Sequence, residues 1–75
     1  MKKYTKPLRI LRKIIGRNIH ELRMERGFTL KKLSRHTNIN PLKIDQYEMG
    51  KNEITLDKLF KIADALGVDI IDLLE

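Results

Sequence analysis

The sequence predicts an all-α domain built from five short helices. Apolar residues recur at helical spacing, and no alternation of apolar and polar residues lasts for the length of a strand. One helix-start pattern also occurs four times: a capping side chain follows an apolar residue, and a second apolar residue stands four positions after the cap. The four copies are Phe28-Thr29 with Leu33, Ile39-Asn40 with Ile44, Ile54-Thr55 with Leu59, and Val68-Asp69 with Leu73.

The first helix is predicted over residues 7–25. Pro7 suits the first turn, where its missing N–H costs nothing, and Gly27 suits the left-handed residue that ends the helix. We expect Gly16 to interrupt this helix, because a helical glycine costs about 1 kcal/mol relative to alanine. The apolar residues at helical spacing are Leu8, Leu11, Ile15, Ile19 and Leu22.

Four shorter helices are predicted over residues 30–36, 41–48, 56–66 and 70–75. We expect Asn38 to take the left-handed conformation in the first turn between them, and Gly67 to end the fourth helix. The apolar face expected for residues 56–66 consists of Leu56, Leu59, Phe60, Ala63 and Leu66. The expected core is Ile15, Ile19, Leu22, Leu30, Leu33, Ile39, Ile44, Tyr47, Leu59, Ile62, Ala63, Leu66, Val68 and Leu73.

Charge is distributed unevenly along the chain. Residues 1–36 hold 12 Lys/Arg and 2 Asp/Glu, whereas residues 37–75 hold 4 and 8. A basic half beside an acidic half favours binding of a polyanion on one face, although a solvated charged surface would show the same composition. We interpret residues 1–6 as a flexible basic arm that precedes a single domain of residues 7–75.

Several classes of protein are disfavoured by what the sequence lacks. There is no cysteine, and no cluster of residues has metal-ligand spacing, so we expect neither a metal nor another cofactor. No apolar run approaches the roughly 20 residues of a membrane span, and no signal peptide is recognisable, which favours a cytoplasmic protein. We do not expect an enzyme, because no nucleophile–base pair or phosphate-binding glycine loop is present. His20 and His36 are interpreted as surface or boundary residues, not as metal ligands.

Residues 29–48 have the spacing of two helices joined by a short turn. Two helices that cross steeply over such a turn allow the second to enter a DNA major groove. Both helix starts offer free N–H groups and a partial positive charge, which suit backbone phosphates. The segment therefore predicts DNA binding.

A set of residues spread over most of the chain stands at the spacing of a known family. These residues are Gly16-Arg17, Leu22-Arg23, Arg26 to Thr29, Leu33, Ile44, Glu48, Gly50 and Ile62 to Val68. Through them the chain resembles the phage-repressor-like XRE family of helix-turn-helix regulators. This resemblance implies a compact five-helix domain that binds a near-palindromic DNA site as a dimer. It also implies an ion pair between Arg23, late in the first helix, and Glu48, at the end of the recognition helix.

The sequence departs from the family pattern at both DNA-contacting helices. Leu30 replaces the usual Gln, and Lys32 replaces a Glu, which removes the capping box and places a cation near a helix start. Lys31, Lys32 and Arg35 either contact phosphate or form a solvated face. Leu42 either touches a thymine methyl or enters the core. With Pro41 and Leu42 at two of the reading positions, we expect modest direct readout and more reliance on groove shape.

The candidate DNA-contacting residues lie at the two helix starts, on the outer face of the recognition helix and in the loop after it. For dimerisation, Ile70, Ile71 and Leu74 are candidates, the alternative being that the last helix only covers the core. The basic arm either follows a neighbouring groove or is a disordered tail. The DNA-contacting candidates are Thr29, Lys31, Lys32, Arg35, Asn40, Pro41, Leu42, Lys43, Gln46, Lys51 and Asn52.

These observations predict a small, sequence-specific DNA-binding transcription regulator that reads the major groove with residues 41–48. The expected partners are double-stranded DNA and a second copy of the chain. The alternative is an antitoxin-like or adaptor module that binds another protein and has weak or no DNA readout. The two differ in their response to salt, because DNA binding weakens steeply as salt rises.

Overall fold

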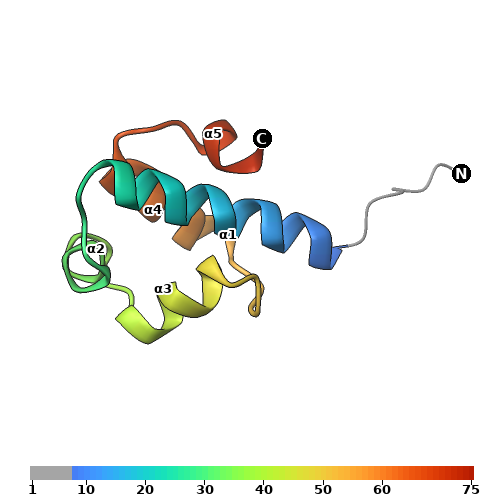
Figure 1. The fold of residues 1–75 in the computed structure, drawn as a ribbon, viewed down its shortest axis with the longest axis horizontal. Coiled ribbons are helices and arrows are strands. Elements are labelled where there is room, and N and C mark those ends of the chain that lie inside the picture. The colour runs from blue at the N-terminus through green and yellow to red at the C-terminus, as the bar shows by residue number, and fades with distance from the viewer. Residues whose placement is uncertain (1–7) are drawn as a thin grey trace, which may run out of the picture.

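The computed structural model describes residues 8–75, which form five helices joined by short turns. The all-α prediction is confirmed. In Figure 1, α1 runs as a central rod with α5 on one side and α3 on the other. Pro7 and the predicted basic arm lie outside the described residues. The helices are α1 (Leu8–Glu25), α2 (Leu30–Thr37), α3 (Pro41–Glu48), α4 (Leu56–Leu66) and α5 (Ile70–Leu74).

The capping residues explain where the helices begin. Thr29 Oγ1 accepts from the Lys32 N–H at 3.0 Å, and Thr55 Oγ1 accepts from the Lys58 N–H at 3.3 Å. At α5, the Asp69 N–H instead donates to the carboxylate of Asp72 at 3.0 Å. Each side chain satisfies an N–H that helical geometry leaves without a carbonyl partner.

The prediction that Gly16 interrupts the first helix is wrong, because α1 is continuous from Leu8 to Glu25. Gly16 lies where α1 approaches the end of α3 most closely. A Cβ atom at this position would stand 2.6 Å from the carbonyl oxygen of Glu48 and closer still to that of Tyr47. The missing side chain therefore permits two helix backbones to touch, and the approach outweighs the helix-propensity cost of glycine.

The core lies between α1 and the other helices. Three residues expected there, Leu22, Leu30 and Val68, are only half-buried and pack against the edge of the core. The expected face of α4 is also partly wrong, because Leu56 and Phe60 are 65% and 55% exposed. The buried members are Ile15, Ile19, Leu33, Ile39, Ile44, Tyr47, Leu59, Ile62, Ala63, Leu66 and Leu73.

Candidate nucleic-acid interface

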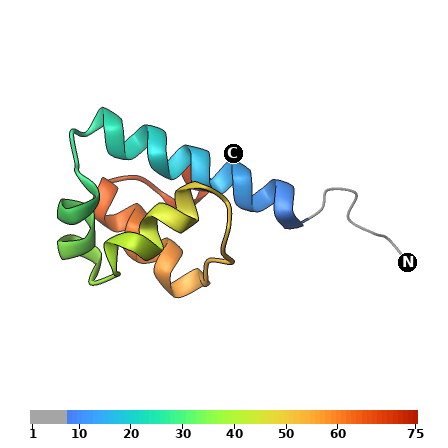
Figure 2. The same cartoon turned by 60° about the horizontal axis from the view of Figure 1, so that its bottom comes forward.

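The turn between α2 and α3 holds the two helices in a helix-turn-helix arrangement, which Figure 2 shows with α2 at one end of α3. Asn38 has φ 60° and ψ 31°, so the predicted left-handed turn residue is confirmed. The Asn38 N–H donates to the Ser34 carbonyl at 2.7 Å, and the Ile39 N–H donates to Thr37 Oγ1 at 3.3 Å. Because Thr37 and Ile39 are buried, the turn is packed as well as hydrogen-bonded.

Two helix starts of this unit remain accessible. Asn40 Oδ1 accepts from the Leu42 N–H at 2.8 Å, and Pro41 has no N–H to satisfy. Helical geometry leaves the Lys43 N–H without a carbonyl partner within the helix. At α2, exposed Thr29 caps one N–H, and the others of the first turn are open. Such N–H groups suit an anion, and phosphate is the anion that DNA offers.

The basic residues of α2 all lie on the surface: Lys31, Lys32 and Arg35 are exposed. Lys32 was expected either to contact phosphate or to be solvated, but it also has a partner within the protein. Its Nζ lies 4.8 Å from the centre of the Phe28 ring. The negative face of an aromatic ring attracts a cation, which offsets part of the unfavourable position of Lys32 near a helix start.

The outer face of α3 presents the predicted reading residues to solvent. Leu42 is 65% exposed, so it does not enter the core. Lys43 is also exposed, whereas Pro41 and Gln46 are half-buried. Half-buried Asp45 makes a minor coulombic contribution to raising the pKa of Arg23.

The loop after α3 continues the same surface. Lys51 is exposed, and half-buried Asn52 donates from Nδ2 to Gln46 Oε1 at 2.5 Å. Gly50 has φ +72° and lies against Lys13, whose Cγ would stand 2.9 Å from a Cβ at this glycine. Nothing in the sequence related Lys13 to this loop.

Arg23 and Glu48 join α1 to the end of α3. Arg23 Nε lies 2.6 Å from Glu48 Oε2, Arg23 Nη2 lies 3.0 Å from Glu48 Oε1, and the arginine also donates from Nη1 to the Phe28 carbonyl at 2.9 Å. Both side chains are largely buried. The hydrogen bond to Glu48 raises the pKa of Arg23 against the opposing effect of burial. A bidentate, buried pair of this kind fixes the relative position of its two helices.

His20 belongs to the same cluster, which sequence analysis missed. Its Nδ1 lies 2.8 Å from Glu48 Oε1. Gly16, His20 and Arg23 are spaced four and three residues apart and therefore share one face of α1. This spacing was readable in the sequence, and the Arg23–Glu48 pair implied by the family resemblance was the signal that could have related His20 to the end of α3.

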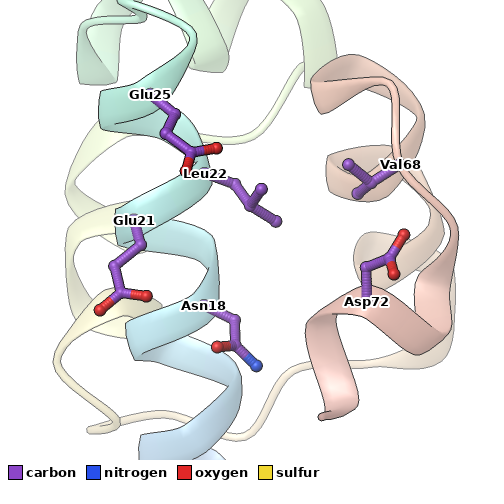
Figure 3. Close-up of a pocket in the computed structure, with 6 residues that line it drawn as sticks. All are labelled: Asn18, Glu21, Leu22, Glu25, Val68 and Asp72. Carbon is purple, nitrogen blue, oxygen red and sulfur yellow. The ribbon is translucent and has the colours of Figure 1, made fainter.

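The residues considered for dimerisation differ in exposure. Ile71 and Leu74 are 54% and 40% exposed, whereas Ile70 is half-buried and packs against the core. On the same side of α1 as α5 lies an open cavity of about 290 Å³. Figure 3 shows the residues that line it, among them Glu21, Glu25 and Asp72. Three of the six lining residues are thus acidic.

Two absences hold for residues 8–75. No group of three or more His, Cys, Asp or Glu side chains is placed to hold a metal ion. None of the helices in this range has the length and apolar character needed to cross a membrane.

The fold and the exposed second helix of the motif define a helix-turn-helix domain, and comparison with known proteins gives its family. Residues 19–73 match the helix-turn-helix (HTH_3) family model. The HTH-type transcriptional regulator y4dJ of Sinorhizobium fredii (strain NBRC 101917 / NGR234), itself uncharacterised, is 30% identical over 63 residues, which cover 84% of this chain and 82% of that protein. The chain belongs to the helix-turn-helix (HTH_3) family of XRE-type DNA-binding transcription regulators.

Solved structures show the same architecture. The clp gene regulator ClgR from Corynebacterium glutamicum superposes with a TM-score of 0.83 at 28% identity, over 92% of this chain and 87% of that chain. The restriction-modification controller protein C.AhdI from Aeromonas hydrophila has a TM-score of 0.80 at 22% identity, over 83% of this chain and 94% of that chain. At that identity, the second match supports the fold alone.

Proposed function

We propose that this protein is a sequence-specific transcription regulator that inserts α3 into the major groove of DNA. The observation that carries the proposal is the solvent-facing side of α3: Leu42 and Lys43 are exposed, with half-buried Gln46 one turn further on, beside two accessible helix starts. A recognition helix needs such a side, because base edges are read by side chains that no other part of the protein covers.

The distribution of charge also supports an orientation in which α3 faces the DNA. The cavity beside α5 is lined by Glu21, Glu25 and Asp72, whereas Lys43 and Lys51 lie on α3 and in the loop that follows it. Figure 1 shows α5 and α3 on opposite sides of α1. DNA approaching the α3 side meets these lysines and stays away from the acidic residues that line the cavity, which favours productive encounters.

We assign different roles to the contacting residues. Lys31, Arg35 and Lys51, together with the N–H groups capped in part by Thr29 and Asn40, bind phosphate and set the position of the protein on the duplex. Leu42 covers a thymine methyl, while Lys43 and Gln46 contact base edges. Pro41 shapes the start of α3, and Lys32 remains near Phe28 and within reach of the backbone.

A dimer is part of the proposal. Two copies related by a two-fold axis would place two α3 helices in successive major grooves, about 34–36 Å apart, on a near-palindromic site. The exposure of Ile71 and Leu74 favours contact between the two copies through α5. Ile70 packs against the core beneath this surface. We expect the protein to act in the cytoplasm, where its DNA target lies, and without catalytic activity or a cofactor.

The second candidate function is that of an antitoxin-like or adaptor module. It is favoured by apolar exposure: Leu56 and Phe60 on α4 are about as open to solvent as Leu42 on α3. Exposed apolar patches of sufficient size mark sites of contact with other proteins. This candidate predicts a complex that survives high salt, in contrast to one held by phosphate.

Selection from a randomised duplex library at moderate salt tests the proposal. An enriched inverted repeat with half-sites one helical turn apart is expected, and a variant carrying Lys43→Ala and Gln46→Ala should lose the enrichment. Lys61→Ala, on the exposed face of α4, is the matched control and should keep it. Absence of retention at low salt would reject DNA binding and favour the adaptor.

The role of residues 1–6 has its own test. A chain that begins at Leu8 should show a smaller salt dependence of binding if the arm binds phosphate. The slope falls by about 1 for each phosphate that the shortened chain no longer neutralises. An unchanged slope would assign the arm no role in binding DNA.

A further inference from the structure

The loop after α3 is attached to one reading residue by both backbone and side chain. The Lys51 N–H donates to the Gln46 carbonyl at 3.0 Å, and Asn52 Nδ2 donates to Gln46 Oε1 at 2.5 Å. The two bonds hold the Gln46 side chain as well as its backbone. A glutamine on an exposed helix face otherwise has several rotamers and two orientations of its amide.

The bond from Asn52 decides which edge of the Gln46 amide remains available. The oxygen and nitrogen of an amide lie on opposite branches of Cδ, so an oxygen directed at Asn52 turns the nitrogen away from it. Gln46 Nε2 has no hydrogen-bond partner among residues 8–75, and it is not among the buried polar atoms that lack one. Nε2 is therefore in contact with solvent and free to donate.

We infer that Asn52 is a specificity-determining positioning residue, which sets Gln46 to present hydrogen-bond donors to the major groove. The inference rests on the proposed function, since it assumes that α3 reads DNA. A glutamine that pairs with adenine uses Oε1 as acceptor and Nε2 as donor together. With Oε1 engaged by Asn52, Gln46 favours guanine, whose O6 and N7 are both acceptors.

The chemistry of Asn52 supplies a test in which the preferred base changes. Asn52→Asp replaces the donor by a carboxylate that only accepts. Gln46 then has to turn Nε2 towards the loop and Oε1 towards the groove. The outward acceptor favours a base with an amino group, namely cytosine through N4 or adenine through N6.

The experiment compares base preferences by selection from a randomised duplex library. Gln46→Ala first identifies the base pair whose preference depends on Gln46. At that base pair, Asn52→Asp should change the ratio of guanine to cytosine or adenine by roughly fivefold or more. In a Gln46→Ala background, Asn52→Asp should leave the preference at that base pair unchanged. Thermal melting verifies that each variant is folded.

Lys51→Ala is the matched control from the same loop. Removal of one phosphate-binding side chain should weaken binding to every sequence and lower the salt slope by about 1, while base preferences stay as they are. If Asn52→Asp has this same uniform effect, Asn52 only binds the DNA backbone and the inference is overturned.

Two further outcomes separate the inference from the proposed function. Enrichment of a site by the unaltered protein, with no single base pair affected by Gln46→Ala, overturns the inference and leaves the proposed function standing. No retention of DNA by the unaltered protein at low salt overturns both.

Discussion

Gly16 of α1 lies against the last turn of α3, where a Cβ atom would stand 2.6 Å from the carbonyl oxygen of Glu48. This oxygen is a backbone atom of Glu48, and the hydrogen bond from Arg23 to the Glu48 side chain also restricts the position of that residue. Neither side of this contact can withdraw by a change of rotamer. Contact between the two helix backbones therefore fixes the position of α3 on α1.

Gly16→Ala tests this contact. Helix propensity alone would stabilise the variant by about 1 kcal/mol, but overpacking against a backbone costs typically about 1–3 kcal/mol. We expect a net loss of stability, measured by urea unfolding. Arg17→Ala is the control, because this exposed neighbour should change stability by no more than about 0.5 kcal/mol. A more stable Gly16→Ala protein would show that α1 and α3 can separate at no cost.

Glu48→Gln tests the ion pair with Arg23. The substitution leaves a buried guanidinium without its counter-charge, and removal of one partner of such a pair costs about 3 kcal/mol. We expect a lower free energy of unfolding and weaker DNA binding, measured by urea unfolding and by titration of a selected site. Glu53→Gln provides the comparison, since its pair with Arg12 is long at 3.8 Å and largely exposed on the Glu53 side. If Glu48→Gln and Glu53→Gln were equally stable, the Arg23–Glu48 pair would not be what positions α3 on α1.

The burial of Tyr47 predicts that the stability of the fold depends on pH in the alkaline range. Burial raises the pKa of the Tyr47 phenol above its ordinary value of 10.0. The folded protein thus retains a proton that the unfolded chain releases, so stability falls as the pH rises from the unfolded pKa through the folded pKa. Tyr47→Phe should reduce the fall in stability above about pH 10, measured by unfolding at several pH values. An identical fall in both proteins would exclude Tyr47 as its source.

Ile71→Asp tests the proposed dimer surface on α5. Because Ile71 is 54% exposed, the substitution should leave the monomer folded. It should lower the solution mass measured by sedimentation or light scattering, because a charge in an apolar contact must be desolvated. Leu56→Asp on α4, where the side chain is 65% exposed, introduces the same charge away from α5 and serves as the control. An unchanged mass for Ile71→Asp would place the interface elsewhere.

Local chemistry explains why most helix boundaries could be predicted. Thr29, Asn40 and Thr55 begin helices because their side chains accept from N–H groups two or three residues ahead. Asn38 and Gly67 end helices because they tolerate positive φ. These effects act between residues close in sequence, and the residue type is enough to recognise them.

Contacts between distant residues could not be predicted in the same way. The role of Gly16 depends on α3 passing above it, and the exposure of Leu56 and Phe60 depends on which turn of α4 faces the core. The approach of Asn52 to Gln46 depends on the path of a loop. The family resemblance supplied the long-range pairing of Arg23 with Glu48, whereas residue spacing alone would have left both as surface charges.

Backbone contact and the ion pair fix the end of α3 to α1 through its last residues, Tyr47 and Glu48. Leu42 and Lys43, at the other end, are exposed and carry no part of the attachment. Under the proposed function, an exchange of these two residues would redirect the protein to a new DNA sequence while the scaffold stays the same. The attachment of α3 and its proposed reading surface are thus separate parts of one short helix.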